Sequence, residues 1–272
     1  MKAITFILFC ISISLFGNAQ STTTKTQKEA VLIVGDDAPT EYKSRMEELA
    51  VILEAKKYKV YRFYSPNNKW EDIKKAALNA SFFIYNGHGT TLGMNGGYGG
   101  LVIQEFISAQ RIKDELKFNR NPVVIYQSAC GAAGSSAWDK LEIGVQEASK
   151  RVAETAKPFL AIGASAYYAD NFYGGVNGFL ELFLSGKTLG EIYKETAESY
   201  CTIEVNRTLN DTELDANLYL GVSSFGGGKK EVLTTVNGKQ VKKYVIEPKD
   251  YPLAFIGPNE LTVNDVVLVT SR

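Results

Sequence analysis

The sequence predicts an α/β fold, a three-layer α/β/α sandwich around a central, mainly parallel β-sheet. From residue 30 onward, short apolar runs alternate with helical patterns, which is typical of βαβ units. Two of these runs lead into reactive side chains, one into His88 and a later one into Cys130. Parallel strands end at the same edge of a sheet, and open α/β folds build their sites at that edge.

The first half of the chain predicts alternating strands and helices. Residues 30–34 are all apolar and indicate a buried strand, whereas residues 59–64 alternate like a strand nearer the sheet edge. A short apolar run leads to His88. In order, the expected elements are a strand at 30–34, a helix at 41–57, a strand at 59–64, a helix at 70–78 and a strand at 81–84.

Residues 90–100 are rich in glycine and predict a loop, which we interpret as a mobile flap beside a site. The segment 231–272 is rich in Val, Thr and Tyr. It predicts a hairpin around Asn237-Gly238 and one or two further strands, which gives the domain a β-rich C-terminal segment. Between them we expect a helix at 106–118, a strand at 123–127, a small-residue turn at 131–136, a helix at 138–155, a strand at 158–163, and helices at 176–184 and 189–203.

The N-terminus has the pattern of a secretory signal peptide. Lys2 supplies the positive charge, an apolar stretch follows, and small residues precede a cleavage point after Ala19. We expect residues 1–19 to be removed, residues 20–29 to form a polar tether and residues 30–272 to form one domain. The protein is then secreted, periplasmic or on the cell surface, with no stable membrane insertion after cleavage.

Composition limits the partners. The 272 residues carry a formal net charge of +0, which gives no reason to expect nucleic acid or an anionic membrane. Cys10 lies in the signal peptide, so the mature chain keeps Cys130 and Cys201. These two could pair in an exported protein, although a buried core position is the simpler interpretation of Cys201. A single histidine and two cysteines are too few for a zinc site.

His88 and Cys130 together suggest nucleophilic catalysis. A thiol beside an imidazole is a nucleophile beside its base. Gly89 has no Cβ, so its backbone can approach a scissile carbonyl, and its N–H with that of Cys130 would form an oxyanion hole. His88 alone would more often be structural, but its pairing with a strand-terminal Ser-Ala-Cys-Gly favours a catalytic role.

These motifs resemble the caspase-like cysteine peptidases (clan CD), most closely the gingipain and clostripain-like branch. The resemblance rests on apolar strands that end in His88-Gly89 and Ala129-Cys130. Looser similarity extends to 159–164 as the next strand, to 186–191 and to 253–258. It implies an endopeptidase with His88 as base, Cys130 as nucleophile and Gly89 as oxyanion donor, acting on a protein or peptide substrate.

The residues around the motifs leave the specificity open. Clostripain-like members carry an acidic residue two positions before the cysteine, where this chain has Ser128. Asp170 could also line an S1 pocket, so a basic P1 residue is possible. Asp36 and Asp37 could orient the site, bind a cation or cap a helix. No cofactor is required, and a structural calcium is possible without a diagnostic motif.

Two other functions remain open. A protein with this fold could keep both residues and act through partners as a catalytically silent binding module, because fold alone does not fix function. The same acyl-enzyme chemistry could also serve a transpeptidase or ligase. The sequence does not decide the natural substrate, the mode of activation, the oligomeric state, or whether the enzyme hydrolyses or ligates.

Overall fold

The computed structural model describes residues 27–90, 98–139, 143–171, 175–201, 203–211, 214–224, 230–245 and 249–267. The predicted signal peptide and most of the glycine-rich loop lie outside these residues. The strands are β1 (Glu29–Val34), β2 (Lys59–Tyr64), β3 (Ala80–Asn86), β4 (Leu101–Val102), β5 (Phe106–Ile107), β6 (Val123–Gln127), β7 (Ala166–Asp170), β8 (Ile203–Asp211), β9 (Leu214–Ser224), β10 (Lys230–Val236), β11 (Lys239–Val245) and β12 (Lys249–Ile256).

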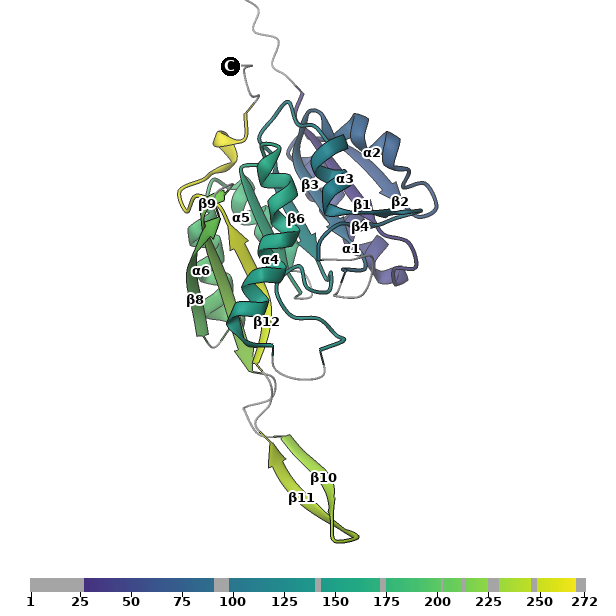
Figure 1. Cartoon of the computed structure of the whole chain (residues 1–272). Helices are drawn as coiled ribbons and strands as arrows, with labels where there is room; N and C mark the ends of the chain where they lie inside the picture. The colour runs from purple at the N-terminus through teal and green to yellow at the C-terminus, as the bar shows by residue number, and fades with distance from the viewer. Residues whose placement is uncertain are drawn as a thin grey trace, which may run out of the picture.

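In the described part of the chain, eight strands form one sheet in the order β2-β1-β3-β6-β7-β12-β9-β8 (Figure 1). The strands from β2 to β7 in this order run parallel, and β12, β9 and β8 extend the sheet in antiparallel fashion. The predicted mainly parallel sheet is therefore confirmed, with β2 at one edge. The central parallel strands β1, β3, β6 and β7 are buried almost throughout because helices cover both of their faces, whereas β2 at the edge is partly exposed.

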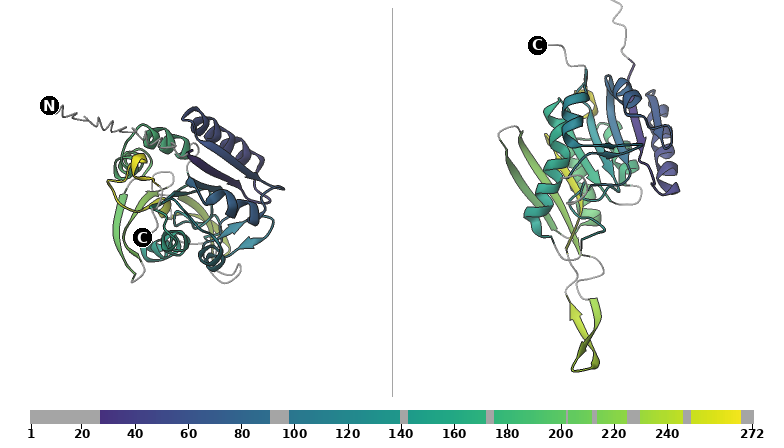
Figure 2. Two further views of the ribbon diagram at one scale, coloured as in Figure 1. Left: turned by 90° about the horizontal axis from the view of Figure 1, so that it is seen from above. Right: turned by 45° about the vertical axis from the view of Figure 1, so that its right-hand side comes forward.

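The helices are α1 (Thr40–Ala55), α2 (Trp70–Ala77), α3 (Ala109–Glu115), α4 (Gly144–Ala161), α5 (Gly175–Leu184) and α6 (Leu189–Tyr200). Buried residues of α2, α3 and α4 pack on one face of the sheet, and those of α1, α5 and α6 pack on the other (Figure 2). The structure therefore has the three layers that the sequence predicts.

The strand predicted at 158–163 is wrong, because these residues form the last turns of α4 and the following turn. Val152, Ala156 and Phe159 are buried at helical spacing, so the apolar run is the inner face of a helix. Gly163 adopts a φ of 103° and ends this segment. The next strand is β7, so Asp170 is the last residue of a strand, and the similarity noted for 159–164 does not fall on a strand.

Other boundaries differ from the prediction. Residues 106–107 form β5, and Ser108 caps the shorter helix α3 by accepting a hydrogen bond from the Arg111 N–H. The fourth helix covers 144–161 instead of 138–155. The antiparallel pair β8 and β9 was not predicted, although Leu218, Leu220 and Val222 alternate as a half-buried strand requires.

The C-terminal prediction is confirmed. β10 and β11 form an antiparallel hairpin whose turn residues Asn237 and Gly238 have φ values of 50° and 74°. Both values are positive, as a type I′ turn requires. The strand that follows, β12, enters the main sheet between β7 and β9.

Candidate functional site

The two predicted motifs meet at the carboxyl edge of the sheet. Strands β3 and β6 are neighbours, and their last residues, Asn86 and Gln127, lie opposite each other. His88 follows β3 by two residues and Cys130 follows β6 by three. Both side chains reach solvent: His88 is exposed and Cys130 is partly exposed.

The loops that carry His88 and Cys130 are in direct backbone contact. A Cβ built on Gly89 would lie 1.9 Å from the carbonyl oxygen of Cys130 and 2.4 Å from its nitrogen. No side chain fits into that space, so packing alone requires glycine at position 89, in addition to the role expected of its N–H. The contact brings the two backbone segments expected to form an oxyanion hole next to each other.

The His88 ring is oriented by the loop after β1. Its Nε2 lies 3.1 Å from the carbonyl oxygen of Asp37. A carbonyl oxygen only accepts, so this hydrogen bond requires a proton on Nε2 and leaves Nδ1 as the nitrogen that exchanges a proton. Asp37 itself has a φ of 52°, a left-handed conformation that is uncommon outside glycine.

The carboxylates at the end of β1 have structural contacts. Asp36 accepts a hydrogen bond of 3.0 Å from the Asn68 amide. Helix α1 begins after Pro39 without a side-chain cap, so the predicted capping role of Asp36 and Asp37 is wrong. It is the backbone carbonyl of Asp37, and not its carboxylate, that contacts His88. A cavity of about 250 Å³ adjoins this loop and is lined by Val34, Gly35, Asp37, Ala38, Pro39, Thr40, Lys43, Tyr64 and Ser65.

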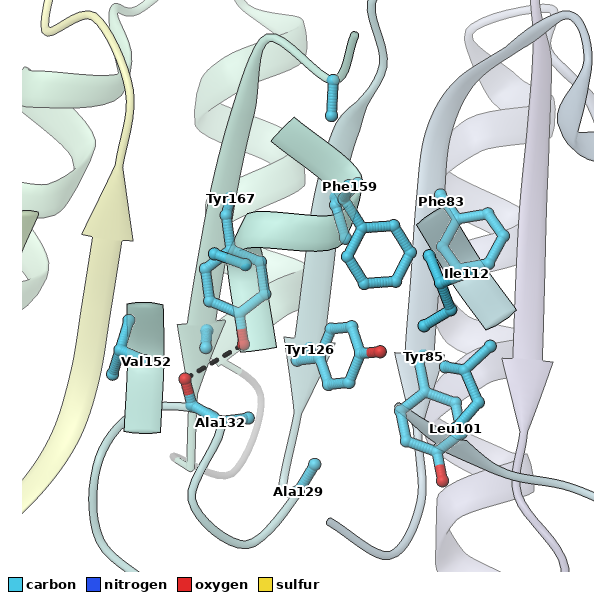
Figure 3. Packing of buried hydrophobic residues seen from close by; sticks show 14 of the residues in the cluster. Phe83, Tyr85, Leu101, Ile112, Tyr126, Ala129, Ala132, Val152, Phe159 and Tyr167 are labelled. Atoms are coloured by element: carbon cyan, nitrogen blue, oxygen red, sulfur yellow. Dashed lines mark hydrogen bonds between the residues drawn. The ribbon is translucent and has the colours of Figure 1, made fainter. Parts of the chain in front are cut away.

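Three buried tyrosines on neighbouring strands support the loops at this edge. Tyr85 on β3, Tyr126 on β6 and Tyr167 on β7 lie on the same face, with adjacent ring centroids 5.1 and 5.6 Å apart (Figure 3). Their hydroxyl groups donate to the backbone carbonyls of His88, Gly100 and Ala132 at 2.9, 3.0 and 3.0 Å, respectively. Burial raises the pKa of all three phenols, so they remain protonated donors.

The loop after Cys130 is also held from the side of α4. Arg151 is nearly buried and donates to the Gly134 carbonyl at 3.3 Å and to Asp139 at 2.8 Å. Its guanidinium also pairs with Glu147 and lies 5.3 Å from the centre of the Tyr98 ring. The backbone that follows the thiol is therefore fixed, while the thiol itself is partly exposed.

Ser128 lies between strand β7, which ends in Asp170, and helix α1. It has a left-handed φ of 54°, and its N–H donates to the Asp170 carbonyl at 2.9 Å. Its hydroxyl accepts a hydrogen bond of 3.3 Å from Arg45. Asp170 lies opposite Gln127 in the sheet and has no exposed surface. The structure thus brings Ser128 and Asp170 together beside the Cys130 loop, with the Asp170 carboxylate beneath the surface.

Sequence reasoning missed the supporting or bordering roles of Arg45, Tyr85, Tyr167 and Arg151. Tyr85 and Tyr167 lie within buried strands, where an aromatic residue is expected for packing alone. Arg151 belongs to a helix whose predicted boundary was six residues too early. Only the cross-strand register and the helix packing reveal that these side chains reach the loops.

Cys201 lies beside β9, where a Cβ built on Gly221 would come within 2.6 Å of its Sγ. The predicted helix around it ends at Tyr200, and Cys201 is its C-terminal cap, partly buried in the core on the α6 side. Cys130 and Cys201 each carry a thiol and form no disulfide. Within the described ranges, no three His, Cys, Asp or Glu side chains are grouped as a metal site would require. None of the helices in these ranges is both long and apolar enough to span a membrane.

Comparison with known families and with curated proteins found no matching family model and no matching protein.

Proposed function

We propose that this protein is an exported cysteine endopeptidase of the caspase-like type, which hydrolyses peptide bonds through Cys130 and His88. The observation that carries the proposal is the backbone contact between Gly89 and Cys130. This contact supports the proposal because Gly89 follows the only histidine, and a site that binds one carbonyl group between the two loops requires them to be adjacent.

The proposed reaction has two steps. The Cys130 thiol transfers its proton to His88, and the resulting thiolate attacks the scissile carbonyl carbon, forming a C–S bond and an oxyanion that the Gly89 and Cys130 N–H groups stabilise. The intermediate collapses with cleavage of the C–N bond, and His88 donates a proton to the departing amine. Water then attacks the thioester with His88 as base, which releases the carboxylic acid and regenerates the thiol.

The surrounding geometry supports these roles. The Asp37 carbonyl orients the imidazole and leaves Nδ1 for proton transfer, as the third group of a triad does. Tyr85 and Tyr167 hold the His88 and Ala132 carbonyls, so the two loops do not depend on substrate for their position. Ser128, which is partly exposed, is the proposed substrate-binding residue, and Asp170 lies beneath it with no exposed surface. The chemistry needs no cofactor, and a protein or peptide is the proposed substrate.

Active-site labelling tests this proposal. Purified protein beginning at Gln20 is treated with acyloxymethyl-ketone peptides that differ only at P1, and adducts are located by mass spectrometry. We expect an adduct on Cys130 that disappears in Cys130→Ala and His88→Ala. Cys201→Ser is the matched control and should label like the wild type. No adduct on Cys130 in folded, reduced protein would contradict the proposal and favour a binding module.

Hydrolysis is then separated from ligation by turnover. A fluorogenic peptide built on the preferred P1 residue is incubated with and without a second peptide that offers a free amine. We expect the free carboxylic acid as the main product under both conditions. A product joined to the added amine as the main species would assign the protein to acyl transfer.

A further inference from the structure

The β10–β11 hairpin extends away from the three-layer body, with its turn at the far end (Figures 1 and 2). Within the described part of the chain, its two strands pair only with each other. A two-stranded ribbon in water has little core of its own. It therefore leaves apolar side chains in solvent: Leu233 is 62% exposed, Val236 50% and Val241 41%.

The hairpin also concentrates positive charge. Residues 230–245 contain four lysines and one glutamate, although the whole chain has a formal net charge of +0. The neutral composition of the chain therefore hides a basic segment. Because opposite charges attract a partner to such a segment, the occupant that fits it is anionic.

The register of the hairpin distributes these residues over both of its faces. Leu233 pairs with Lys242, and Val236 pairs with Lys239. Paired residues share a face and consecutive residues lie on opposite faces, so each face carries an exposed apolar side chain and a lysine. A groove in a protein would cover one face and leave the other in water. A lipid interface surrounds both faces.

An exposed tryptophan lies near the base of the hairpin. The Tyr251 N–H donates to the Ser135 hydroxyl at 2.8 Å, and the Ser135 N–H donates to the Tyr251 carbonyl at 3.3 Å. Tyr251 lies two residues after Lys249, where the chain returns from the hairpin to the sheet. Trp138 follows Ser135 by three residues and is 78% exposed. Tryptophan is enriched at membrane–water interfaces because its ring is apolar and its N–H is polar.

We propose that the hairpin and Trp138 dock the protein reversibly on a membrane surface that contains anionic lipids. The apolar side chains enter the boundary between headgroups and acyl chains, and the lysines contact the lipid phosphates. Of the seven large apolar side chains that are exposed in the described part of the chain, four belong to this docking surface: Leu233, Val236, Val241 and Trp138. The inference goes beyond the proposed peptidase activity and does not depend on it.

Vesicle binding tests the proposal. Protein beginning at Gln20 is sedimented with vesicles of phosphatidylcholine alone or of phosphatidylcholine mixed with phosphatidylglycerol. Tryptophan fluorescence is recorded in parallel. The chain has two tryptophans, and Trp70 is only 2% exposed, so a change in emission reports on Trp138. Heparin and poly-glutamate are the soluble anionic probes.

The variants separate charge from apolar contact. Lys239→Glu with Lys242→Glu reverses the charge of the hairpin, and Val236→Ser with Val241→Ser removes apolar surface. Lys56→Glu with Lys117→Glu makes the same charge change at exposed positions of the body and is the matched control.

We expect wild type and the body control to bind the mixed vesicles, with a blue shift of the emission, and not to bind phosphatidylcholine alone. The hairpin lysine variant should lose at least about tenfold in affinity. The valine variant should bind more weakly and should lose what binding wild type retains at high salt, where attraction between charges is screened. Trp138→Phe should sediment with vesicles but show no blue shift. Cys130→Ala should bind as wild type does, because docking does not use the thiol.

The outcomes that would overturn the proposal are specific. Folded wild type that ignores the mixed vesicles would refute lipid docking. Binding to heparin or poly-glutamate without binding to vesicles would assign the hairpin to a soluble polyanion or an acidic protein instead. Equal affinity of the hairpin lysine variant and the body control would remove the hairpin from the interaction. None of these results bears on the labelling of Cys130, so the proposed function is judged separately.

Discussion

The hydroxyl of Tyr167 donates a 3.0 Å hydrogen bond to the carbonyl of Ala132, two residues after Cys130. Tyr167 lies within the sheet and Ala132 lies in the loop that carries Cys130, so a core residue helps to position this loop. Tyr85 has the same relationship to His88. The core and the candidate site are therefore coupled through single hydrogen bonds between side chain and backbone.

Removal of the Tyr167 hydroxyl should make the loop that carries Cys130 and Ala132 less rigid. Tyr167→Phe leaves the Ala132 carbonyl without this donor in the core, which costs about 1–2 kcal/mol of unfolding free energy. We expect a similar loss in chemical denaturation and slower labelling of Cys130. Tyr168→Phe is the control, because Tyr168 is equally buried but faces the opposite side of the sheet. Equal labelling rates in the two variants would contradict the coupling.

Gly89→Ala should abolish labelling of Cys130. The added methyl group would overlap the Cys130 backbone at 1.9 Å, so the two loops must separate. Gly178→Ala in α5 is the control, since a Cβ there meets nothing within 4 Å. That variant should be at least as stable as wild type, because alanine is favoured over glycine in a helix by about 1 kcal/mol. Labelling of Gly89→Ala at the wild-type rate would show that the loops do not need this contact.

Arg151→Met should destabilise the fold by about 1–3 kcal/mol, because the Gly134 carbonyl loses its donor and the Asp139 carboxylate keeps its bond from the Ser136 N–H but loses its cation. Arg62→Met removes an arginine that pairs with Glu47 and Glu54 at the surface. Its expected cost is at most about 1 kcal/mol. Urea unfolding of both variants measures the difference, and equal midpoints would contradict the proposed support from α4.

Glu115 should make stability depend on acid pH. Bonds from Arg111, followed by those from Trp70 and Lys74, lower its pKa from 4.5 to about 2. A lowered pKa in the folded state stabilises the protein above the unfolded value, and this contribution is lost as the pH falls from about 4.5 to about 2. Because Glu115 is 31% exposed, solvent limits the effect to about 1 kcal/mol.

The comparison that tests this is wild type against Glu115→Gln, unfolded in urea at pH 6 and pH 3. The difference in unfolding free energy between wild type and Glu115→Gln should be smaller at pH 3 than at pH 6. Glu71→Gln, at an exposed position on α2, is the control. The unfolding free energy of this variant should change between pH 6 and pH 3 by as much as that of wild type. A gap that stays constant or widens at pH 3 would contradict the assignment.

The sequence predicted the parts of the fold whose pattern is local. The strands leading to His88 and Cys130 consist mostly of apolar residues, and Asn237-Gly238 has the residues that a two-residue turn needs. The segment 158–163 was misread because a buried helix end and a buried strand are both continuous apolar runs. For the same reason, the helix that contains Arg151 was predicted at 138–155 instead of 144–161.

Only part of the arrangement of the site residues could be predicted from the sequence. Order along the chain was enough to place His88 and Cys130 at one sheet edge, since neighbouring parallel strands end together. The contact of Arg45 with Ser128 depends on how α1 packs on the sheet, and no spacing in the sequence encodes it. The tyrosine bonds depend on cross-strand register, which a single sequence does not reveal.

Strand β12 runs antiparallel to β7, and this direction affects where the chain can gain or lose segments during evolution. Leu253 pairs with Asp170 at the end of β7, so β12 starts at the edge where the parallel strands finish. Ser224 of β9 pairs with Lys249 at the same edge, and the β10–β11 hairpin is inserted between them (Figure 1). Loop closure entropy grows only slowly with length. New segments can therefore be acquired or lost here, at the edge where His88 and Cys130 lie, without a change in the strands that lead to these residues.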